Sequence, residues 1–160
     1  MNLRIGFGYD IHRLVAGRPL FLGCCPIPFD RGLLGHSDGD VAAHALADAM
    51  LSAAGAGDLG RHFPSGDPAW AGAPGRRILE ETARILKEQG ASLAQADLTI
   101  VAEEPRLAPH REAMIAALAA AVGCDPAAVN VKGRSNEGMG ELGRGEAICA
   151  YAVVLIRLQP

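Results

Sequence analysis

Aromatic side chains are scarce in this sequence. Only 4% of its 160 residues are Phe, Trp or Tyr although 49% are hydrophobic, because alanine supplies much of the apolar content; a further 20 residues are glycine. Small side chains let helices approach closely but fill little volume each, whereas a protein interior must be densely packed. We therefore expect identical neighbours in an oligomer to supply part of the core.

A surplus of positive charge and a long apolar run are also missing. The 15 Lys and Arg residues are outnumbered by 18 Asp and Glu, which leaves a net charge of −3 with both signs interspersed. This pattern excludes the basic footprint of nucleic-acid binding. No stretch reaches the roughly 20 apolar residues of a membrane helix, and the first residues are typical of a strand, not of a signal or transit peptide. We expect a cytoplasmic protein that binds neither nucleic acid nor membranes.

The four cysteines, at positions 24, 25, 124 and 149, include no Cys-x-x-Cys pair. Their spacing excludes a zinc ribbon and a redox motif, and it favours reduced, mostly buried thiols. A chain of this length buries a sizeable core without disulfides. Because no linker or repeat divides the sequence, we expect residues 1–160 to form a single domain.

Hydrophobic periodicity and turn residues predict a mixture of strands and helices. The predicted strands are 3–9, 97–102, 129–133 and 147–158, with a short hairpin at 20–22 and around residue 27, and the predicted helices are 40–54, 76–89 and 109–122. Ser37 or Asp38 is expected to cap the first helix. The elements do not alternate strictly, which indicates an α+β fold. The prediction is a mixed four-stranded sheet with helices packed on one face.

Asp10 and His12 follow the first predicted strand, where residues two apart point the same way. A carboxylate and an imidazole thus project together as two ligands for one divalent ion. The first helix places His44 on one face with Asp40 and Asp48. His44 completes an Asp/His/His set, which is typical of catalytic zinc, and Asp48 then orients a ligand or a neighbouring group. The alternative is a solvated Asp-x-His pair and a packed core histidine.

Residues 36–40, His-Ser-Asp-Gly-Asp, precede the first predicted helix. The free N–H groups of a helix N-terminus favour an anion such as phosphate, but an ordinary capping segment has the same composition. Residues 6–8, Gly-Phe-Gly, are not a dinucleotide fingerprint, because Ile11 stands where the third glycine belongs.

Three further polar loops combine charge with turn residues. Residues 58–67 include Asp58, which is suited to binding polyol hydroxyls, although a solvated loop has the same composition. Residues 131–138 follow a strand and are suited to holding a phosphate, with Glu137 near a second cation. Arg144 lies between two glycines, where it is suited to bidentate contact with an anion.

Taken in order, these segments are more specific than any one of them. The sequence reads RIGFGYDIH at 4–12, GHSDGDVAAHAL at 35–46, GDLG at 57–60, FP at 63–64, DP at 67–68 and GRGE at 143–146. This order resembles the 2-C-methyl-D-erythritol 2,4-cyclodiphosphate synthases of non-mevalonate isoprenoid biosynthesis, over nearly the whole chain.

The resemblance implies a homotrimer with its sheets around a central axis and active sites between neighbouring subunits. The implied substrate is 4-diphosphocytidyl-2-C-methyl-D-erythritol 2-phosphate, whose 2-phosphate attacks the β-phosphorus, so that CMP leaves and a cyclic diphosphate forms. Asp10, His12 and His44 would hold zinc or another divalent ion. A Mg²⁺ or Mn²⁺ touched by Glu137 would bridge the α- and β-phosphates. The implied enzyme is a phosphorus–oxygen lyase that acts through metal and electrostatic catalysis.

The resemblance also implies roles for individual residues. His36 and Ser135 would be catalytic, by stabilising charge in the transition state. Residues 58–60 and 63–67 would hold the erythritol and its phosphate, and backbone groups of 102–108 would read the cytosine edge. The implied substrate-binding residues are Asp10, His12, His36, Ser37, Asp58, Leu59, Gly60, Phe63, Pro64, Ser65, Gly66, Asp67, Ala102, Glu103, Glu104, Pro105, Arg106, Leu107, Ala108, Arg134, Ser135, Asn136, Glu137, Glu141 and Arg144.

The sequence departs from the family pattern at three positions. Ser135 keeps a hydroxyl but lacks the methyl group of the more usual threonine, and Arg134 adds a cation near the diphosphate. Glu141 replaces an aromatic residue that, with Arg144, lines an isoprenoid-diphosphate cavity on the trimer axis of relatives. The acidic side chain argues against such a ligand here.

Two other functions use the same residues. A zinc-dependent phosphohydrolase of a related small phosphorylated substrate would share the three ligands but add water to its product, whereas cyclisation adds none. A trimeric binding protein with a structural metal would lose its trimer in His44→Ala, whereas the enzyme would lose activity and keep its assembly.

Overall fold

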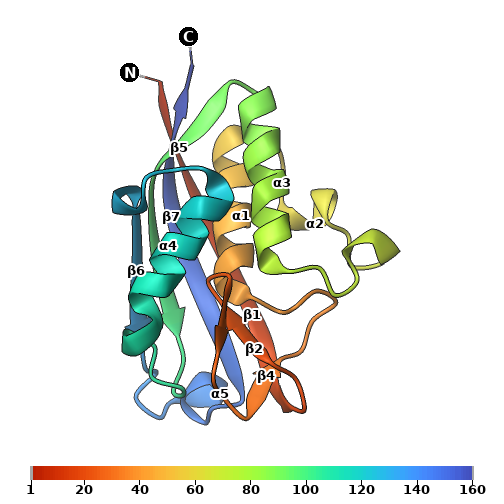
Figure 1. Ribbon diagram of the computed structural model, residues 1–160, viewed down its shortest axis with the longest axis vertical. Coiled ribbons are helices and arrows are strands. Elements are labelled where there is room, and N and C mark those ends of the chain that lie inside the picture. The colour runs from red at the N-terminus through yellow and green to blue at the C-terminus, as the bar shows by residue number, and fades with distance from the viewer. Residues whose placement is uncertain (1, 160) are drawn as a thin grey trace.

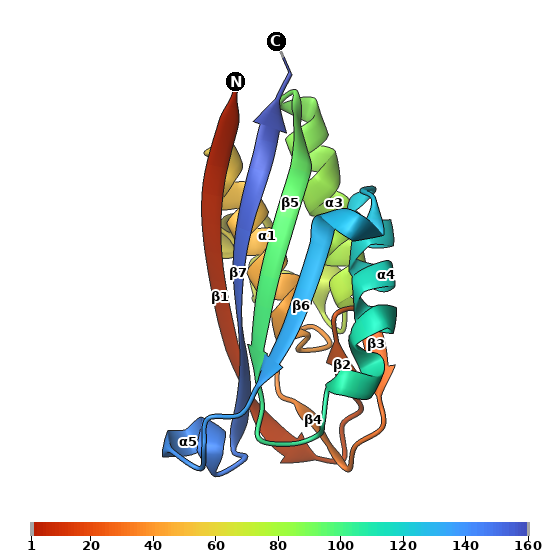
Figure 2. The same cartoon turned by 90° about the vertical axis from the view of Figure 1, so that its left-hand side faces the viewer.

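The computed structural model describes residues 2–159, and a five-stranded sheet runs through it (Figure 2). The order β4-β1-β7-β5-β6 is formed by β1 (Leu3–Ala16), β4 (Arg31–Leu33), β5 (Ala91–Val101), β6 (Val129–Arg134) and β7 (Ala147–Leu158). β5 and β6 are parallel, and the other neighbouring strands are antiparallel. The mixed sheet of the α+β prediction is therefore confirmed.

The predicted number of strands, four, is wrong, because β4 adds a fifth at the edge of the sheet. β4 is only three residues long and pairs with residues 14–16 of β1. That end of β1 extends past its pairing with β7, which reaches Arg13 and Ala147, and so it offers a free edge. Three residues are too few to show a hydrophobic period, so no pattern marks β4 in the sequence.

β1 also continues through residues 10–16, beyond its predicted end at Tyr9. The periodic pattern breaks there because Asp10 and His12 are polar at positions that face the helices. They face a site and not the apolar core, so hydrophobic periodicity cannot detect them as strand. β7 has the bounds predicted from its apolar run, whereas β5 begins at Ala91, ahead of the predicted residue 97.

Three long helices cover one face of the sheet, as predicted (Figures 1 and 2). They are α1 (Val41–Ala54), α3 (Gly75–Glu88) and α4 (Arg111–Val122). The shorter elements are the predicted hairpin of β2 (Leu20–Leu22) and β3 (Cys25–Ile27), with α2 (Leu59–His62), α5 (Gly140–Gly143), η1 (Pro68–Trp70), η2 (Ala108–His110) and η3 (Pro126–Ala128). Within residues 2–159, no helix combines the length and the apolarity needed to cross a bilayer.

α1 packs directly on β1 and is buried on nearly every side. A Cβ atom at Gly6 would lie 2.0 Å from the carbonyl oxygen of Ala49, and one at Gly8 would lie 2.1 Å from that of Ala45. Glycine in the strand and alanine in the helix therefore permit an approach that larger side chains would block. This contact brings the turn of α1 that carries His44 against β1, and it accounts for many of the small residues.

α1 has Asp40 as its N-cap, in place of the predicted Ser37 or Asp38. The Asp40 side chain is fully buried. It accepts hydrogen bonds from the backbone N–H groups of Gly23, Cys24, Ala42 and Ala43. One carboxylate thus joins the start of α1 to the turn of the β2–β3 hairpin. Ser37 is left free for a different partner, described below.

The opposite face of the sheet is uncovered in the single chain. Side chains alternate between the two faces of a strand, and the outward ones on β1 and β7 include large apolar groups. The exposed members are Leu3, Ile5, Phe7, Tyr9, Ile11, Tyr151 and Val153. Tyr151 contacts both Phe7 and Tyr9, with ring centroids 6.3 and 5.0 Å apart. A contiguous apolar surface of this kind marks an interaction face.

Candidate functional site

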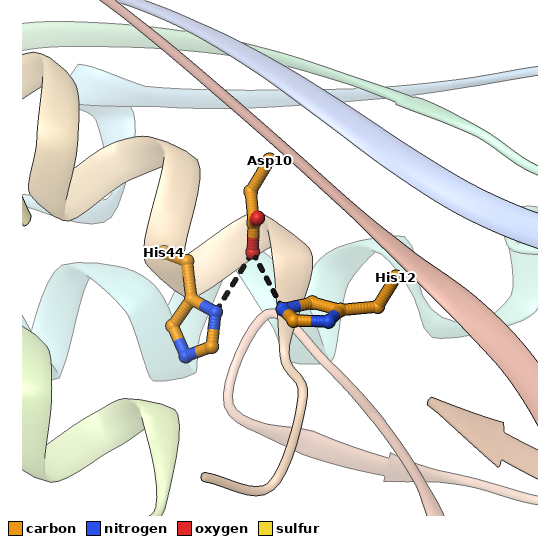
Figure 3. Close-up of side chains that lie close together, drawn as sticks. All are labelled: Asp10, His12 and His44. Atoms are coloured by element: carbon orange, nitrogen blue, oxygen red, sulfur yellow. Dashed lines mark hydrogen bonds and ion pairs between the residues drawn. The ribbon is translucent and has the colours of Figure 1, made fainter. Parts of the chain in front are cut away.

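Asp10, His12 and His44 meet where β1 crosses the first turns of α1 (Figure 3). Asp10 Oδ2 lies 2.8 Å from His44 Nδ1 and 3.1 Å from His12 Nε2. One ligand atom from each residue lies within 4.8 Å of the other two, and no second group of this kind is found within residues 2–159. The strand and the helix therefore bring together the ligand set predicted from their spacing.

The contacts between Asp10 and the two histidines shift the pKa values of Asp10 and His12. Burial acts to raise the pKa of Asp10, but hydrogen bonds from His12 and His44, with their charge attraction, outweigh it and hold that pKa below its usual value. The hydrogen bond to Asp10 raises the pKa of His12 and outweighs the effect of burial. The Asp10 carboxylate is thus ionised, so the cluster attracts a cation.

The His44 ring is also held through a second contact, because its Nε2 lies 3.1 Å from Ser37 Oγ. Such a partner orients a ring so that its other nitrogen faces a metal ion. Two imidazole nitrogens and one carboxylate oxygen fit zinc and other divalent ions of similar preference. A packed core histidine would explain the burial of His44 but not its contact with Asp10.

The cluster lies on the wall of a cavity of about 250 Å³. The lining residues are Asp10, His12, His36, Ser37, His44, Leu59, Gly60, Phe63, Ser65, Trp70 and Ile78. Three predicted segments, around 36–37, 58–60 and 63–67, therefore meet the ligand set in one place. Trp70 and Ile78 were missed by the sequence prediction. The only tryptophan of the chain, in a stretch rich in Pro and Gly, was a usable signal for Trp70.

Asp48 and Asp58 shape the loop beside this cavity. Asp48 Oδ1 accepts a hydrogen bond from the Leu59 N–H group at 2.9 Å, so Asp48 orients a neighbouring segment, one of the two roles predicted for it. Asp58 caps α2, and Asp67 caps η1. Asp58 and Asp67 border the cavity without lining it in the single chain.

A second cavity, of about 530 Å³, lies beside β6. The lining residues are Ala102, Glu103, Pro105, Arg106, Leu107, Ala108, Arg111, Met114, Val131, Lys132, Gly133, Arg134 and Ser135. The cavity thus joins most of the predicted cytosine-reading loop to Arg134 and Ser135. Arg111 and Met114 also line it and were not predicted, whereas Val131 and Lys132 belong to the 131–138 segment predicted to hold a phosphate. Arg111 Nε donates to the Val131 carbonyl at 2.9 Å, and this bond ties α4 to β6.

The loop after β6 is linked to the cytosine-reading loop. The Asn136 N–H group donates to Glu103 Oε2 at 3.3 Å, and Ser135 Oγ donates to Glu137 Oε1 at 3.0 Å. Glu137 has a left-handed backbone conformation with φ 52°, and its side chain is exposed. The hydroxyl of Ser135 and the carboxylate of Glu137 therefore lie side by side at the surface.

Several predicted residues lie outside both cavities of the single chain. The ones not yet placed are Pro64, Gly66, Glu104, Glu141 and Arg144. Glu141 is exposed on α5. Arg144 Nε donates to Glu146 Oε1 at 2.7 Å, and both side chains are exposed.

The two halves of the predicted site are separated within one chain. Two strands, β7 and β5, lie between β1, which carries Asp10 and His12, and β6, which leads into Ser135. Neighbouring strands are about 4.8 Å apart, so β1 and β6 are separated by roughly 14 Å. The structure of one chain therefore does not bring Glu137 or residues 102–108 to the histidine cluster.

Known proteins align with this chain over nearly its full length. The YgbB family profile matches residues 3–157. The chain is 53% identical to the 2-C-methyl-D-erythritol 2,4-cyclodiphosphate synthase of Laribacter hongkongensis over 157 residues, which cover 98% of this chain and 97% of that protein. A solved structure of a 2C-methyl-D-erythritol-2,4-cyclodiphosphate synthase in its CDP-bound form matches with a TM-score of 0.88 and 42% identity, covering 96% of this chain and 99% of that one.

A bifunctional relative gives the same result for part of its length. The structure of the bifunctional IspDF from Campylobacter jejuni matches with a TM-score of 0.94 and 34% identity. The match covers 98% of this chain but 42% of that one, so this chain spans less than half of the bifunctional protein. Sequence and fold agree over nearly the full length of the chain. The chain belongs to the YgbB family, in company with the 2-C-methyl-D-erythritol 2,4-cyclodiphosphate synthases it matches.

Proposed function

We propose that the protein converts 4-diphosphocytidyl-2-C-methyl-D-erythritol 2-phosphate to 2-C-methyl-D-erythritol 2,4-cyclodiphosphate and CMP. The proposal depends above all on the Asp10, His12 and His44 cluster, in a chain about half identical to synthases of that name. In the reaction, an oxygen of the 2-phosphate forms a bond to the β-phosphorus. The bond from that phosphorus to the α-phosphate oxygen breaks, CMP leaves with the electron pair, and no water is consumed.

Two divalent ions are part of the proposal. Asp10, His12 and His44 would hold zinc or a similar ion, and the Asp/His/His donor set supports this assignment. Glu137 would bind a Mg²⁺ or Mn²⁺ between the α- and β-phosphates, since an exposed carboxylate is the ligand that these ions prefer. When bound, the ions neutralise the charge of the phosphate oxygens.

The residues of the chain then position the substrate and stabilise charge. The attacking phosphate is already an anion, so the mechanism needs no strong general base. His36 is exposed at the cavity of the cluster, and its Nε2 lies 3.2 Å from the Asp67 carbonyl oxygen. We assign His36 and Ser135 to the charge that develops in the transition state. Arg134, next to Ser135, adds a positive charge for the diphosphate.

The two ends of the substrate would occupy the two cavities. Residues 58–60 and 63–67 line or border the cavity of the cluster, so they would hold the erythritol and its phosphate. Backbone groups of 102–108 would read the cytosine edge. The second cavity, of about 530 Å³, has a volume suited to a nucleotide.

The active enzyme is proposed to be a homotrimer, with its sheets around a central axis and its sites between subunits. The uncovered apolar face that includes Phe7, Tyr9 and Tyr151 supports this assembly, because it is large and lies on the central strands. The separation of the two cavities supports it as well. A second subunit could bring its 102–108 loop and Glu137 to the histidine cluster of the first.

Three smaller proposals follow from the sequence. Residues 1–160 form one synthase domain, and the protein works in the cytoplasm. Glu141 is acidic and exposed, and it lies near Arg144 in sequence. We therefore expect no isoprenoid diphosphate to bind on the trimer axis beside these residues.

The masses of the products test the proposed reaction. Protein supplied with Zn²⁺ and Mg²⁺ is incubated with the diphosphocytidyl substrate, and the products are weighed by mass spectrometry. Cyclisation yields CMP and a product whose mass, added to that of CMP, equals the mass of the substrate. Products heavier by one water indicate a phosphohydrolase instead, and the absence of CMP would refute the assignment. His44→Ala should abolish CMP release and leave the oligomer intact, whereas a structural metal would make the oligomer dissociate.

A further inference from the structure

The segment that carries His36 and Ser37 is held through three consecutive backbone carbonyls. The carbonyl oxygens of Gly35 and Ser37 accept hydrogen bonds from the two terminal nitrogens of the Arg18 guanidinium, at 3.4 and 3.0 Å. The carbonyl between them, that of His36, accepts from the N–H group of Gly72 at 2.8 Å. The segment belongs to no helix or strand, so these bonds set its conformation.

Arg18 reaches the segment from the turn between β1 and β2. This turn packs against Gly32 of β4, where a Cβ atom would lie only 2.2 Å from the carbonyl oxygen of Pro19. The base of Arg18 is therefore fixed by the sheet edge. Its guanidinium is a planar fork that spans two carbonyls two residues apart, which the single ammonium of a lysine cannot do in the same way.

The position of this backbone matters for two side chains at once. His36 is exposed, with one hydrogen bond to the Asp67 carbonyl oxygen. Ser37 is buried, and its hydroxyl contacts His44 Nε2. A shift of residues 35–37 would move both the imidazole at the cavity and the partner of a metal ligand. A displacement of roughly 1 Å in such groups can cost about 100-fold in rate.

We propose that Arg18 is a positioning residue for His36 and Ser37. It acts through their backbone and leaves the chemistry to them. The expected effect on the reaction rate rests on the proposed function. The restraint of residues 35–37 by the hydrogen bonds from Arg18 does not depend on which reaction the site catalyses.

Amide hydrogen exchange tests directly whether Arg18 restrains residues 35–37. In Arg18→Ala, the amides of residues 34–40 should exchange at least about tenfold faster than in the wild type, because a loop that loses two hydrogen bonds opens more often. Arg4→Ala is the matched control. It removes a guanidinium of β1 that donates to the Ala54 carbonyl at 3.5 Å, and it should leave exchange at 34–40 unchanged.

Steady-state kinetics then show whether the hydrogen bonds from Arg18 to residues 35 and 37 contribute to catalysis. Arg18→Ala should lower kcat by about 10- to 100-fold, with a smaller change in KM because the hydrogen bonds of Arg18 go to residues 35 and 37 and not to the proposed cytosine loop. Arg18→Lys should recover part of the loss. Millimolar guanidinium chloride should raise the kcat of Arg18→Ala and leave that of the wild type unchanged, which a general loss of stability would not produce.

Several outcomes would overturn the inference. They are a wild-type kcat in Arg18→Ala, a lower kcat without faster exchange at 34–40, and a lower kcat that guanidinium does not raise. If Arg18→Ala does not fold, Arg18→Lys carries the test, and wild-type exchange and kcat in that variant count against the proposal. A wild-type protein that releases no CMP would instead refute the proposed function, and the exchange comparison would still decide whether Arg18 holds the segment.

Discussion

At the scale of single residues, local spacing rules predicted some of the site and tertiary contacts made the rest. Asp10, His12 and His44 could be predicted as one set, because strand and helix periods determine which side chains share a face. The contact between Ser37 and His44 could not, since it depends on the path of an irregular loop. Arg18 is a stronger example: its partners lie 17 and 19 positions further along the chain, and no spacing rule links them.

Zinc binding should strengthen as the pH rises toward neutrality. His12 binds a metal ion only when its ring nitrogen is unprotonated, and the hydrogen bond to Asp10 raises the pKa of His12 above its ordinary 6.5. Below that raised pKa, zinc must displace a proton, so the apparent association constant should rise by about tenfold per pH unit and then level off. The pKa of Asp10 is lowered, so this carboxylate stays ionised and adds no slope.

Calorimetric titration with Zn²⁺ across this pH range measures the effect. His12→Asn, which has no proton to lose, should bind zinc more weakly and with a shallower slope. An affinity that does not change with pH would contradict the assignment of His12 as a ligand.

At the scale of elements, long periodic segments were predictable and short or polar ones were not. α1, α3 and β7 follow from apolar patterns of ten or more residues, which a single register satisfies. β4 exists only because the end of β1 offers it an edge. Residues 6–8 fail as a nucleotide motif, and their role in the structure is to let α1 approach β1. A sequence pattern shows that glycine is present but not which neighbour requires it.

Gly8→Ala should destabilise the fold strongly. The new methyl group would meet the Ala45 carbonyl oxygen at 2.1 Å, in backbone that cannot move without separating α1 from β1. We expect a loss of about 3 kcal/mol in the free energy of unfolding, measured by urea denaturation. Gly66→Ala is the control, because a Cβ atom there has no neighbour within 4 Å, and it should change stability by less than about 0.5 kcal/mol. Equal stability of the two variants would contradict the close approach.

At the scale of the whole molecule, a single chain leaves an apolar sheet face uncovered and the proposed site divided. Its sheet buries one face under helices and exposes aromatic and branched side chains on the other. The cavity of the histidine cluster and the cavity beside β6 each contain part of the proposed site. The scarcity of aromatic residues already favours an oligomer, and the exposed face places several of the few aromatics where subunits would meet. A symmetric assembly would cover the exposed face and bring the two parts of the site together.

Phe7→Asp should convert the proposed trimer to monomers. Phe7 is 58% exposed at the centre of the uncovered face, and a charge buried there without a partner opposes association. Sedimentation should give three chain masses for the wild type and one for the variant, with CMP release lost in the monomer. Phe7→Leu is the control: it keeps an apolar side chain on the uncovered face, so this variant should sediment as the wild type does. A monomeric wild type would refute the assembly.

The sequence by itself determined the fold class, the long helices and the grouping of Asp10, His12 and His44 as candidate ligands, because these depend on local periods of two and 3.6 residues. The tertiary structure alone decided the fifth strand, the cap of α1, the partner of His44 and the hold of Arg18 on residues 35–37. Each of these depends on an edge, a buried N–H group or a carbonyl supplied by a distant part of the chain. Such partners become neighbours only when the chain is folded, so no local pattern in the sequence predicts them.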